Sequence, residues 1–338
     1  MAQTFTYDKP FQLECGVTLP SLSIAYDTFG RMNAERSNIV WVCHALTANS
    51  DVADWWPHTV EEGCFLDPAK YFTVCANFLG SHYGTTGPLS INPATGESWY
   101  GDFPLVTVRD MVRAHQLLAE HLGIERVKLL IGSSIGGFQC LEWCVMQPDF
   151  AEHAAFIATT PRTKPWASAF NESQRMAIEG DPTFGERTAE AGLNGMATAR
   201  SIALLSYRGG MAYDKTQEDA DPDQVSFQRR VLSYQRYQGE KLRRRFNAYS
   251  YYRLSQAVDS HNIARGRGSV EEVLRGIKAK SLVVAITSDI LFPPSDHKVL
   301  IENIPSVEYH LIDSDFGHDG FLVEHEQLNR IILDFLNK

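Results

Sequence analysis

The chain has 338 residues, and its 31 Lys and Arg against 41 Asp and Glu give a formal net charge of −10. This acidic balance argues against a nucleic-acid partner, and no apolar run is long enough to cross a membrane. The 44% hydrophobic and 21% charged content is that of an ordinary globular protein, large enough for one α/β domain with an insertion.

The N-terminus lacks the basic start and the apolar stretch of a signal peptide, so we expect a cytoplasmic protein. The cysteines are scattered, without a Cys-x-x-Cys pair, and no His-x-x-x-His spacing occurs. We therefore expect no bound metal and no disulfides. Buried thiols in a reducing compartment are predicted for all six cysteines: Cys15, Cys43, Cys64, Cys75, Cys140 and Cys144.

Strand-like apolar runs dominate the first part of the chain, at residues 11–14, 22–26, 38–43 and 71–75. Trp55 and Trp56 lie in the loop before the last of these runs, and adjacent tryptophans there are expected to pack into the core. Apolar residues at helical spacing then predict a helix over 106–122.

The next segment has the pattern of a nucleophile elbow. The apolar run 127–131 leads into Gly132-Ser-Ser-Ile-Gly136, and residues 137–147 have helical character that stops before Pro148. Strand, sharp turn and helix around Gly-x-Ser-x-Gly place the central serine, Ser134, at the tip of a strained turn. Glycines are needed two residues before and two after it, because the backbone passes too close there for a side chain.

After a further strand at 153–158, the character of the chain changes. Helix-like mixtures of polar and apolar residues occupy about 163–279. Within them, Arg243-Arg244-Arg245 is expected to form the solvated face of a helix. Strands return at 281–286 and 307–312, before a last helix over 324–336.

This order of elements predicts an α/β-hydrolase fold, a mostly parallel central sheet flanked by helices on both faces. Residues 1–162 and 280–338 form the predicted core. Residues 163–279 form the predicted helical lid, inserted before the last strands.

A serine nucleophile needs a base, and the base needs a group that orients it. In this fold the chain order is Ser, then Asp or Glu, then His. Asp289 follows one predicted strand and His318 the next, at the edge where open α/β sheets place their sites. We therefore assign Asp289 as the orienting acid and His318 as the base. Competing candidates are Asp313 or Asp315 for the acid and His310 or His325 for the base.

Two backbone N–H groups are expected to hold the oxyanion of the reaction. One is that of Ile135, directly after the nucleophile. The other is that of Leu46, in the loop His44-Ala-Leu-Thr47 that leaves a central strand. An ordinary loop with a structural histidine is the alternative reading of that segment.

Segments spread over nearly the whole chain resemble the homoserine O-acetyltransferases, α/β-hydrolase-type acyltransferases of methionine biosynthesis. Several of them lie outside the general hydrolase motifs, which makes the likeness more specific than the elbow. In chain order the matching segments are His44-Ala-Leu-Thr47 and residues 84–93, 136–139, 170–178, 237–241, 288–294 and 317–322.

The resemblance implies a triad of Ser134, Asp289 and His318, with Leu46 and Ile135 as oxyanion donors. It also implies that Asp319 holds the amino group of homoserine and Arg208 its carboxylate. Acetyl-CoA would be a co-substrate in a double displacement, with no permanently bound cofactor, and the enzyme would be a homodimer.

The chain departs from the family pattern at Ser133, where a glycine is usual, at Ile135, where methionine is usual, and at Ala48-Asn49. These differences leave the predicted reacting groups unchanged, but they bear on which acyl donor and which acceptor the protein prefers. Alternatives therefore remain: a transferase using succinyl-CoA or serine, an esterase using water, or a non-catalytic binding protein on the same fold.

Overall fold

The computed structural model describes residues 2–221, 223 and 229–338; Met1 of the predicted core and residues 222 and 224–228 of the predicted lid lie outside the described residues. Eight strands of the described chain form one sheet, in the order β1-β4-β6-β5-β7-β8-β9-β10. Neighbouring strands from β6 to β10 run parallel, whereas β1 and β4 join one edge antiparallel. The bounds are β1 Gln3–Tyr7, β4 Leu22–Phe29, β5 Ile39–Cys43, β6 Phe72–Ala76, β7 Val127–Ser133, β8 Ala151–Ile157, β9 Lys280–Ile286 and β10 Val307–Ile312.

The predicted mostly parallel sheet is confirmed, but its N-terminal edge differs from the prediction. The strand predicted at 11–14 is confirmed only for its first two residues: β2 (Phe11–Gln12) pairs with β3 (Thr18–Leu19) in a small separate sheet. Strand β1 was not predicted at all. Its side chains are mostly exposed, so it lacks the apolar run of a buried strand and forms through its backbone pairing with β4.

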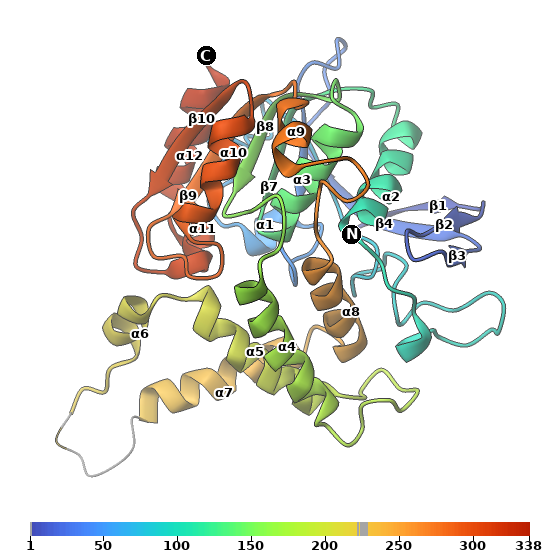
Figure 1. The fold of residues 1–338 in the computed structure, drawn as a ribbon, viewed down its shortest axis with the longest axis vertical. Coiled ribbons are helices and arrows are strands. Elements are labelled where there is room, and N and C mark those ends of the chain that lie inside the picture. The colour runs from blue at the N-terminus through green and yellow to red at the C-terminus, as the bar shows by residue number, and fades with distance from the viewer. Residues whose placement is uncertain (1, 222, 224–228) are drawn as a thin grey trace.

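Helices cover both faces of the sheet, as Figure 1 shows. On β5, Trp41 belongs to one apolar core, whereas its neighbours Val40 and Val42 belong to the other. Because both faces are buried, the central strands read as continuous apolar runs. The first core includes α2 (Val108–His121) and α3 (Ile135–Met146), and the second includes α1 (Val52–Trp55) and α12 (His325–Leu336).

The inserted segment supplies helices at one end of the sheet. Helices α4 to α8 lie together there, whereas α9 lies beside α10 (Figure 1). The division into core and lid at 163 and 279 stays a prediction. The bounds are α4 Pro165–Glu179, α5 Leu193–Tyr207, α6 Gly210–Gln217, α7 Arg229–Arg243, α8 Ala248–Asp259, α9 Val270–Arg275 and α10 Lys298–Asn303.

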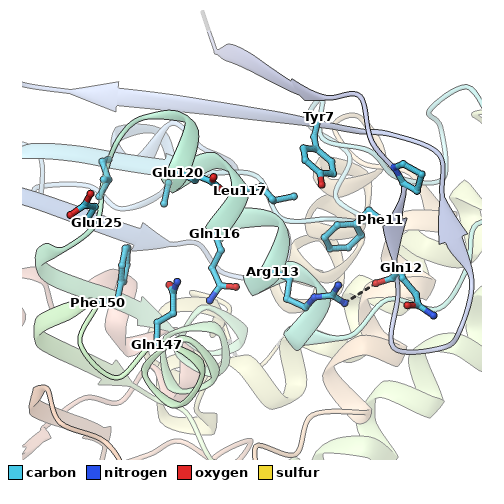
Figure 2. Close-up of a pocket in the computed structure, with 13 residues that line it drawn as sticks. Tyr7, Phe11, Gln12, Arg113, Gln116, Leu117, Glu120, Glu125, Gln147 and Phe150 are labelled. Carbon is cyan, nitrogen blue, oxygen red and sulfur yellow. Dashed lines mark hydrogen bonds between the residues drawn. The ribbon is translucent and has the colours of Figure 1, made fainter.

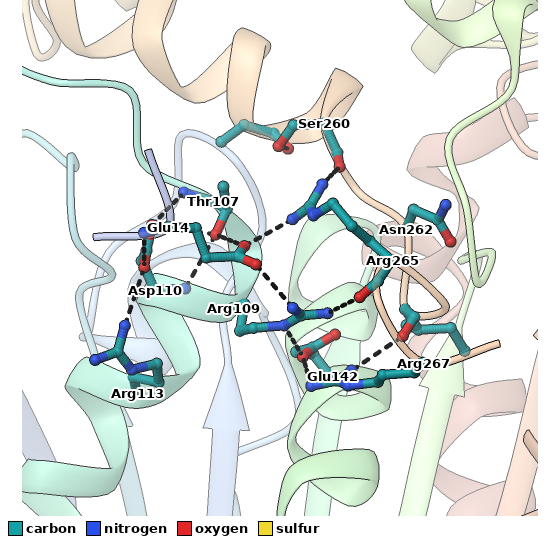
Figure 3. Close-up of polar contacts among 12 residues, drawn as sticks. Glu14, Thr107, Arg109, Asp110, Arg113, Glu142, Ser260, Asn262, Arg265 and Arg267 are labelled. Carbon is teal, nitrogen blue, oxygen red and sulfur yellow. Dashed lines mark hydrogen bonds and ion pairs between the residues drawn. The ribbon is translucent and has the colours of Figure 1, made fainter. Parts of the chain in front are cut away.

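A network of ion pairs joins α2, α3 and the segment after α8 (Figure 3). Glu142, buried on α3, accepts hydrogen bonds from Arg109 Nε of α2 at 2.8 Å and from a terminal nitrogen of Arg267 at 2.5 Å. Arg109 and Arg265 both reach Glu14, in the loop between β2 and β3, at 2.8 and 2.7 Å. The network therefore ties the return from the lid to two helices of the core.

All six cysteines are free thiols, and four of them are buried. The prediction of burial is wrong for Cys15, which is exposed in the turn between β2 and β3, and for Cys64, which is half-buried in a loop. Within the described ranges, no helix combines the length and the apolar character needed to cross a membrane.

Candidate active site

Ser134 occupies the strained turn that its sequence pattern predicts. It joins β7 to α3 with φ 56° and ψ −125°, a conformation that residues with a side chain rarely adopt. A Cβ on Gly132 would lie 2.4 Å from the backbone of Gly136, and one on Gly136 would lie 2.1 Å from the carbonyl oxygen of Cys43. The two glycines are therefore required by close backbone packing, and the turn projects Ser134 from the end of the strand.

His318 and Asp289 are joined by a short hydrogen bond between buried groups. Nδ1 of His318 lies 2.7 Å from Oδ2 of Asp289. The other carboxylate oxygen, Oδ1, accepts the N–H groups of Leu291 at 2.8 Å and Phe292 at 2.9 Å. Asp289 is thus fixed as an acceptor, which makes Nδ1 the protonated nitrogen of a neutral His318. Nε2 has no hydrogen-bond partner within the described chain.

The surroundings of His318 favour its protonated form. Burial lowers the pKa of this imidazole, but the charge of Asp289 and the hydrogen bond to it, helped by Asp319, outweigh burial and raise the pKa above its ordinary value. A neutral His318 therefore carries an available lone pair on Nε2 together with an enhanced affinity for a proton. These are the properties of a general base.

Ser134 and His318 line the same cavity, with a volume of about 360 Å³. The sheet side of its wall includes the loop 45–49, and the lid contributes basic and aromatic side chains. The complete lining is Ala45, Leu46, Thr47, Ala48, Asn49, Asp54, Trp55, Ser134, Arg200, Tyr207, Lys241, Arg245, His318, Asp319, Phe321 and Leu322.

A larger hollow, of about 690 Å³, lies between the N-terminal strands and α2 (Figure 2). Its wall includes Tyr7, Phe11 and Phe150, and Arg113 spans part of it by donating to the carbonyl of Gln12 at 2.7 Å. None of the predicted site residues lines it. The chemistry of the side chains, not cavity size, therefore places the candidate site at Ser134.

The competing acids and bases lie elsewhere. Asp315 pairs with Lys215, and Asp313 accepts the hydroxyl of Thr287 at 3.3 Å. His310 stands on β10 beside Glu308, and His325 packs against the ring of His58. The lining of the cavity around Ser134 includes none of these candidates.

The two N–H groups predicted to hold an oxyanion are available to donate hydrogen bonds to a ligand. Ile135 is the first residue of α3, so its N–H has no partner inside the helix. Leu46 is the second residue of a turn that closes with a hydrogen bond from Ala48 N to Ala45 O at 3.0 Å. Neither N–H has an acceptor in the part of the chain that the structure describes.

His44, at the start of the same loop, has a structural position. It is fully buried, stacks on Phe78 with 4.1 Å between ring centroids, and bonds through Nδ1 to the carbonyl of Ala45 at 2.8 Å. Burial lowers its pKa to about 3, so the ring is neutral at physiological pH. His44 therefore supports the loop, while the cavity wall begins at Ala45.

Only one of the two residues predicted to contact the substrate lies in the cavity wall. Asp319 lines the cavity, but Arg208 does not; its Nε lies 3.4 Å from Oδ2 of Asp319. Burial raises the pKa of Asp319, although Arg200, Arg208 and His318 all favour its charged form. Arg200 is the basic residue on α5 that lines the cavity. Its place in the wall follows from how α5 packs against the other inserted helices and against residues 317–319, which no local sequence pattern indicates.

Trp56 is fully buried, as expected, and Trp55 packs against the same core while also lining the cavity. The expectation for the arginine triplet requires correction at Arg245. Helix α7 ends at Arg243, and Arg243 and Arg244 are solvated and pair with Glu240. Arg245 lies beyond the helix end and enters the cavity wall, because the chain turns there toward α8.

No group of three or more His, Cys, Asp and Glu side chains is arranged to hold a metal ion in the described ranges. The groups at this site are instead a strained serine, a histidine hydrogen-bonded to a carboxylate, and free N–H groups. Together they can carry out acyl transfer through the serine hydroxyl.

Comparison with known proteins agrees with this geometry. Residues 38–325 match the family model of the α/β hydrolase fold. A homoserine O-acetyltransferase of Cyclobacterium marinum is 44% identical over 333 residues, which are 98% of this chain and 94% of the relative. The chain belongs to the homoserine O-acetyltransferase family.

Solved structures support membership of this acyltransferase family. The homoserine O-acetyltransferase of Bacillus anthracis superposes with a TM-score of 0.91 at 26% identity, covering 100% of this chain and 98% of that one. The acetyl esterase MekB superposes with a TM-score of 0.86, also at 26% identity, covering 100% of this chain and 97% of the other. The shared architecture thus occurs in proteins named for transfer and for hydrolysis.

Proposed function

We propose that this enzyme transfers an acetyl group from acetyl-CoA to the hydroxyl of L-homoserine, through an acetyl-serine at Ser134. The observation that carries the proposal is that Ser134, His318 and Asp319 line one cavity together with Arg200. A nucleophile and its base are thereby combined with acidic and basic side chains, as an amino-acid acceptor requires. The names of the relatives support an acetyl group and homoserine as its acceptor.

In the first half-reaction, Nε2 of His318 takes the proton of Ser134 Oγ as this oxygen attacks the thioester carbon. The N–H groups of Leu46 and Ile135 hold the resulting oxyanion; losing one such donor typically costs about 3 kcal/mol. Asp289 stabilises the imidazolium and keeps it oriented. The intermediate collapses to acetyl-Ser134, and the departing thiolate takes the proton from His318.

In the second half-reaction, His318 deprotonates the homoserine hydroxyl as it attacks the acyl carbon of acetyl-Ser134. The tetrahedral intermediate collapses with cleavage of the bond to Ser134 Oγ, which takes the proton back from His318, and O-acetylhomoserine is released. Asp319 receives the ammonium group of the acceptor, and Arg200 its carboxylate. The prediction of Arg208 for the carboxylate gives way to Arg200, because Arg208 is outside the lining and already faces Asp319. Arg208 instead favours the charged form of Asp319 that an ammonium group requires.

The acceptor has to outcompete water, which is abundant. Holding both charged ends of homoserine raises the effective concentration of its hydroxyl at the acyl carbon. The lid supports this by covering the cavity with residues such as Tyr207 and Arg200. An amino acid that lacks either charged end should therefore be a poor acceptor.

The test is to incubate the enzyme with acetyl-CoA, with and without L-homoserine, and to follow free thiol. Release that depends on homoserine supports the proposal. Parallel reactions with succinyl-CoA and with L-serine determine the donor and the acceptor. Absence of thiol release from any acyl-CoA would contradict a transferase and favour a binding protein.

An acetyl esterase with water as acceptor is the second candidate, and the structural likeness to MekB favours it. The same cavity and the same Ser134 would serve both reactions. Thiol release of equal rate with and without homoserine would identify hydrolysis. A cytoplasmic location and a homodimer remain predictions.

A further inference from the structure

Arg245 reaches from the lid to the loop that carries Leu46. It lies between the end of α7 at Arg243 and the start of α8 at Ala248. One terminal nitrogen of its guanidinium donates to the carbonyl of Thr47 and to the hydroxyl of Tyr83, the latter at 2.6 Å. The other donates to the hydroxyl of Thr47 at 3.3 Å. A single planar side chain thus holds two groups of one loop residue.

These contacts fall on the turn that presents the Leu46 N–H. The hydrogen bond from Ala48 N to Ala45 O makes Leu46 and Thr47 the two central residues of this turn. Fixing the carbonyl and the hydroxyl of Thr47 restricts rotation of the peptide groups on either side of it. On the far side, the carbonyl of Asn49 accepts from Trp55 Nε1 at 2.9 Å. The loop is therefore held from the lid at one end and from α1 at the other.

The residues after Arg245 are themselves docked on the core. The ring of Phe246 lies 5.6 Å from that of His82 and 5.7 Å from that of Tyr83, between centroids. Nδ2 of Asn247 lies 2.9 Å from Nδ1 of His82. These contacts fix the backbone that carries Arg245. Together with the hydrogen bonds to Thr47 and Tyr83, they restrict the positions that the guanidinium can occupy.

We propose that Arg245 is a positioning residue of the oxyanion hole: its guanidinium holds the turn Ala45–Ala48 so that the Leu46 N–H faces the acyl oxygen. The inference rests on the proposed function in one respect, the assignment of Leu46 as an oxyanion donor. It makes part of the oxyanion hole depend on the placement of the lid, since the group that holds the turn comes from between α7 and α8.

The decisive substrate is p-nitrophenyl acetate, which acylates a serine but carries no phosphate groups. In Arg245→Met, which keeps much of the apolar stem but loses the donors, we expect acylation by this ester to slow about 30-fold. That loss is smaller than the 10²–10³-fold effect of removing an oxyanion donor outright, because the Leu46 N–H remains present but is misplaced. The KM for the ester should change little.

Two further variants separate positioning from other roles. Arg244→Met is the matched control, because Arg244 is an adjacent, 75% exposed side chain that pairs with Glu240, and its acylation rate should equal that of the wild type. Tyr83→Phe removes one partner of Arg245 and leaves Thr47 held, so it should slow acylation only a few-fold. Thermal unfolding of each variant establishes that it is folded.

The outcomes distinguish this inference from the proposed function. If Arg245→Met matches the wild type with p-nitrophenyl acetate and loses only affinity for acetyl-CoA, Arg245 binds the donor and the inference is wrong. An equal loss in Arg244→Met would also overturn it. A wild-type enzyme acylated by the ester but inactive with homoserine contradicts the proposed function alone.

Discussion

Asp289 and His318 form the hydrogen-bonded pair that we propose activates Ser134. The carboxylate is fixed by two backbone N–H groups and by the imidazole, so it has no freedom to turn away. Its charge favours the imidazolium that forms when Ser134 gives up its proton. At the scale of single residues, the hydrogen bond between Asp289 and His318 therefore both orients the imidazole and raises its affinity for a proton.

This pairing predicts the pH dependence of acylation. The base must be neutral, so the acylation rate should rise with pH and level off above an apparent pKa higher than the ordinary 6.5 of histidine. In Asp289→Asn the charge that raises this pKa is lost. The midpoint should then move to lower pH, and the plateau should fall by about 10³–10⁴-fold because the tautomer is no longer fixed.

The rate of acylation by p-nitrophenyl acetate, measured between pH 5 and pH 9, gives both the midpoint and the plateau. The midpoint has to be determined to within about one pH unit. His310→Asn is the control, since His310 is a partly exposed histidine of β10 outside the cavity. An unchanged midpoint in Asp289→Asn would show that Asp289 does not act on the base.

At the scale of elements, the network around Glu142 holds the chain where it returns from the lid. Glu142→Ala leaves Arg109 and Arg267 without their shared acceptor, and breaking a buried pair typically costs 3–5 kcal/mol. Arg109 keeps Glu14 and both arginines are partly exposed, so we expect a loss near the lower end, about 3 kcal/mol in the free energy of unfolding.

Urea denaturation measures this difference directly. The control is Glu152→Ala, because Glu152 is 41% exposed and pairs with Lys128 at the surface. That change should cost less than about 1 kcal/mol. Equal losses in the two variants would contradict a special role for the buried network.

Elements with a strong local pattern could be predicted from the sequence. Strands β5, β6, β7 and β9 are continuous apolar runs because both faces of the sheet are covered. The elbow could be located because its glycines are required by contacts within a few residues and with the adjacent strand. Strand β1 could not, since its pairing with β4 depends on a partner and not on its own apolar pattern.

At the scale of the whole molecule, the net charge is a poor guide to the site. The chain carries −10 overall, yet the lid places Arg200, Lys241 and Arg245 in the wall of the cavity. These three cations lie on or beside two different helices, α5 and α7. Their convergence on the cavity of Ser134 depends on how the inserted helices pack, which explains why no local pattern of the sequence indicated Arg200 or Arg245.

The chain order expected of this fold indicated the reacting groups, and the folded chain showed their surroundings. Ser134, Asp289 and His318 are each recognisable from a short motif at the end of a strand. Trp55 and Arg245 cannot be recognised in this way. Each has a neighbour of the same residue type: Trp56 is buried in the core, and Arg244 is exposed to solvent. A difference of one position in the sequence decides which residue of each pair lines the cavity.

The central claim is that one serine carries the acyl group between two substrates. The most direct measurement is the intact mass of the protein after exposure to acetyl-CoA alone, followed by peptide mapping and by addition of L-homoserine. We predict a gain of one acetyl group at Ser134, absent from Ser134→Ala, that homoserine removes as O-acetylhomoserine. An enzyme that turns over without acetylating Ser134, or an acetyl-Ser134 that homoserine does not discharge, would contradict the account.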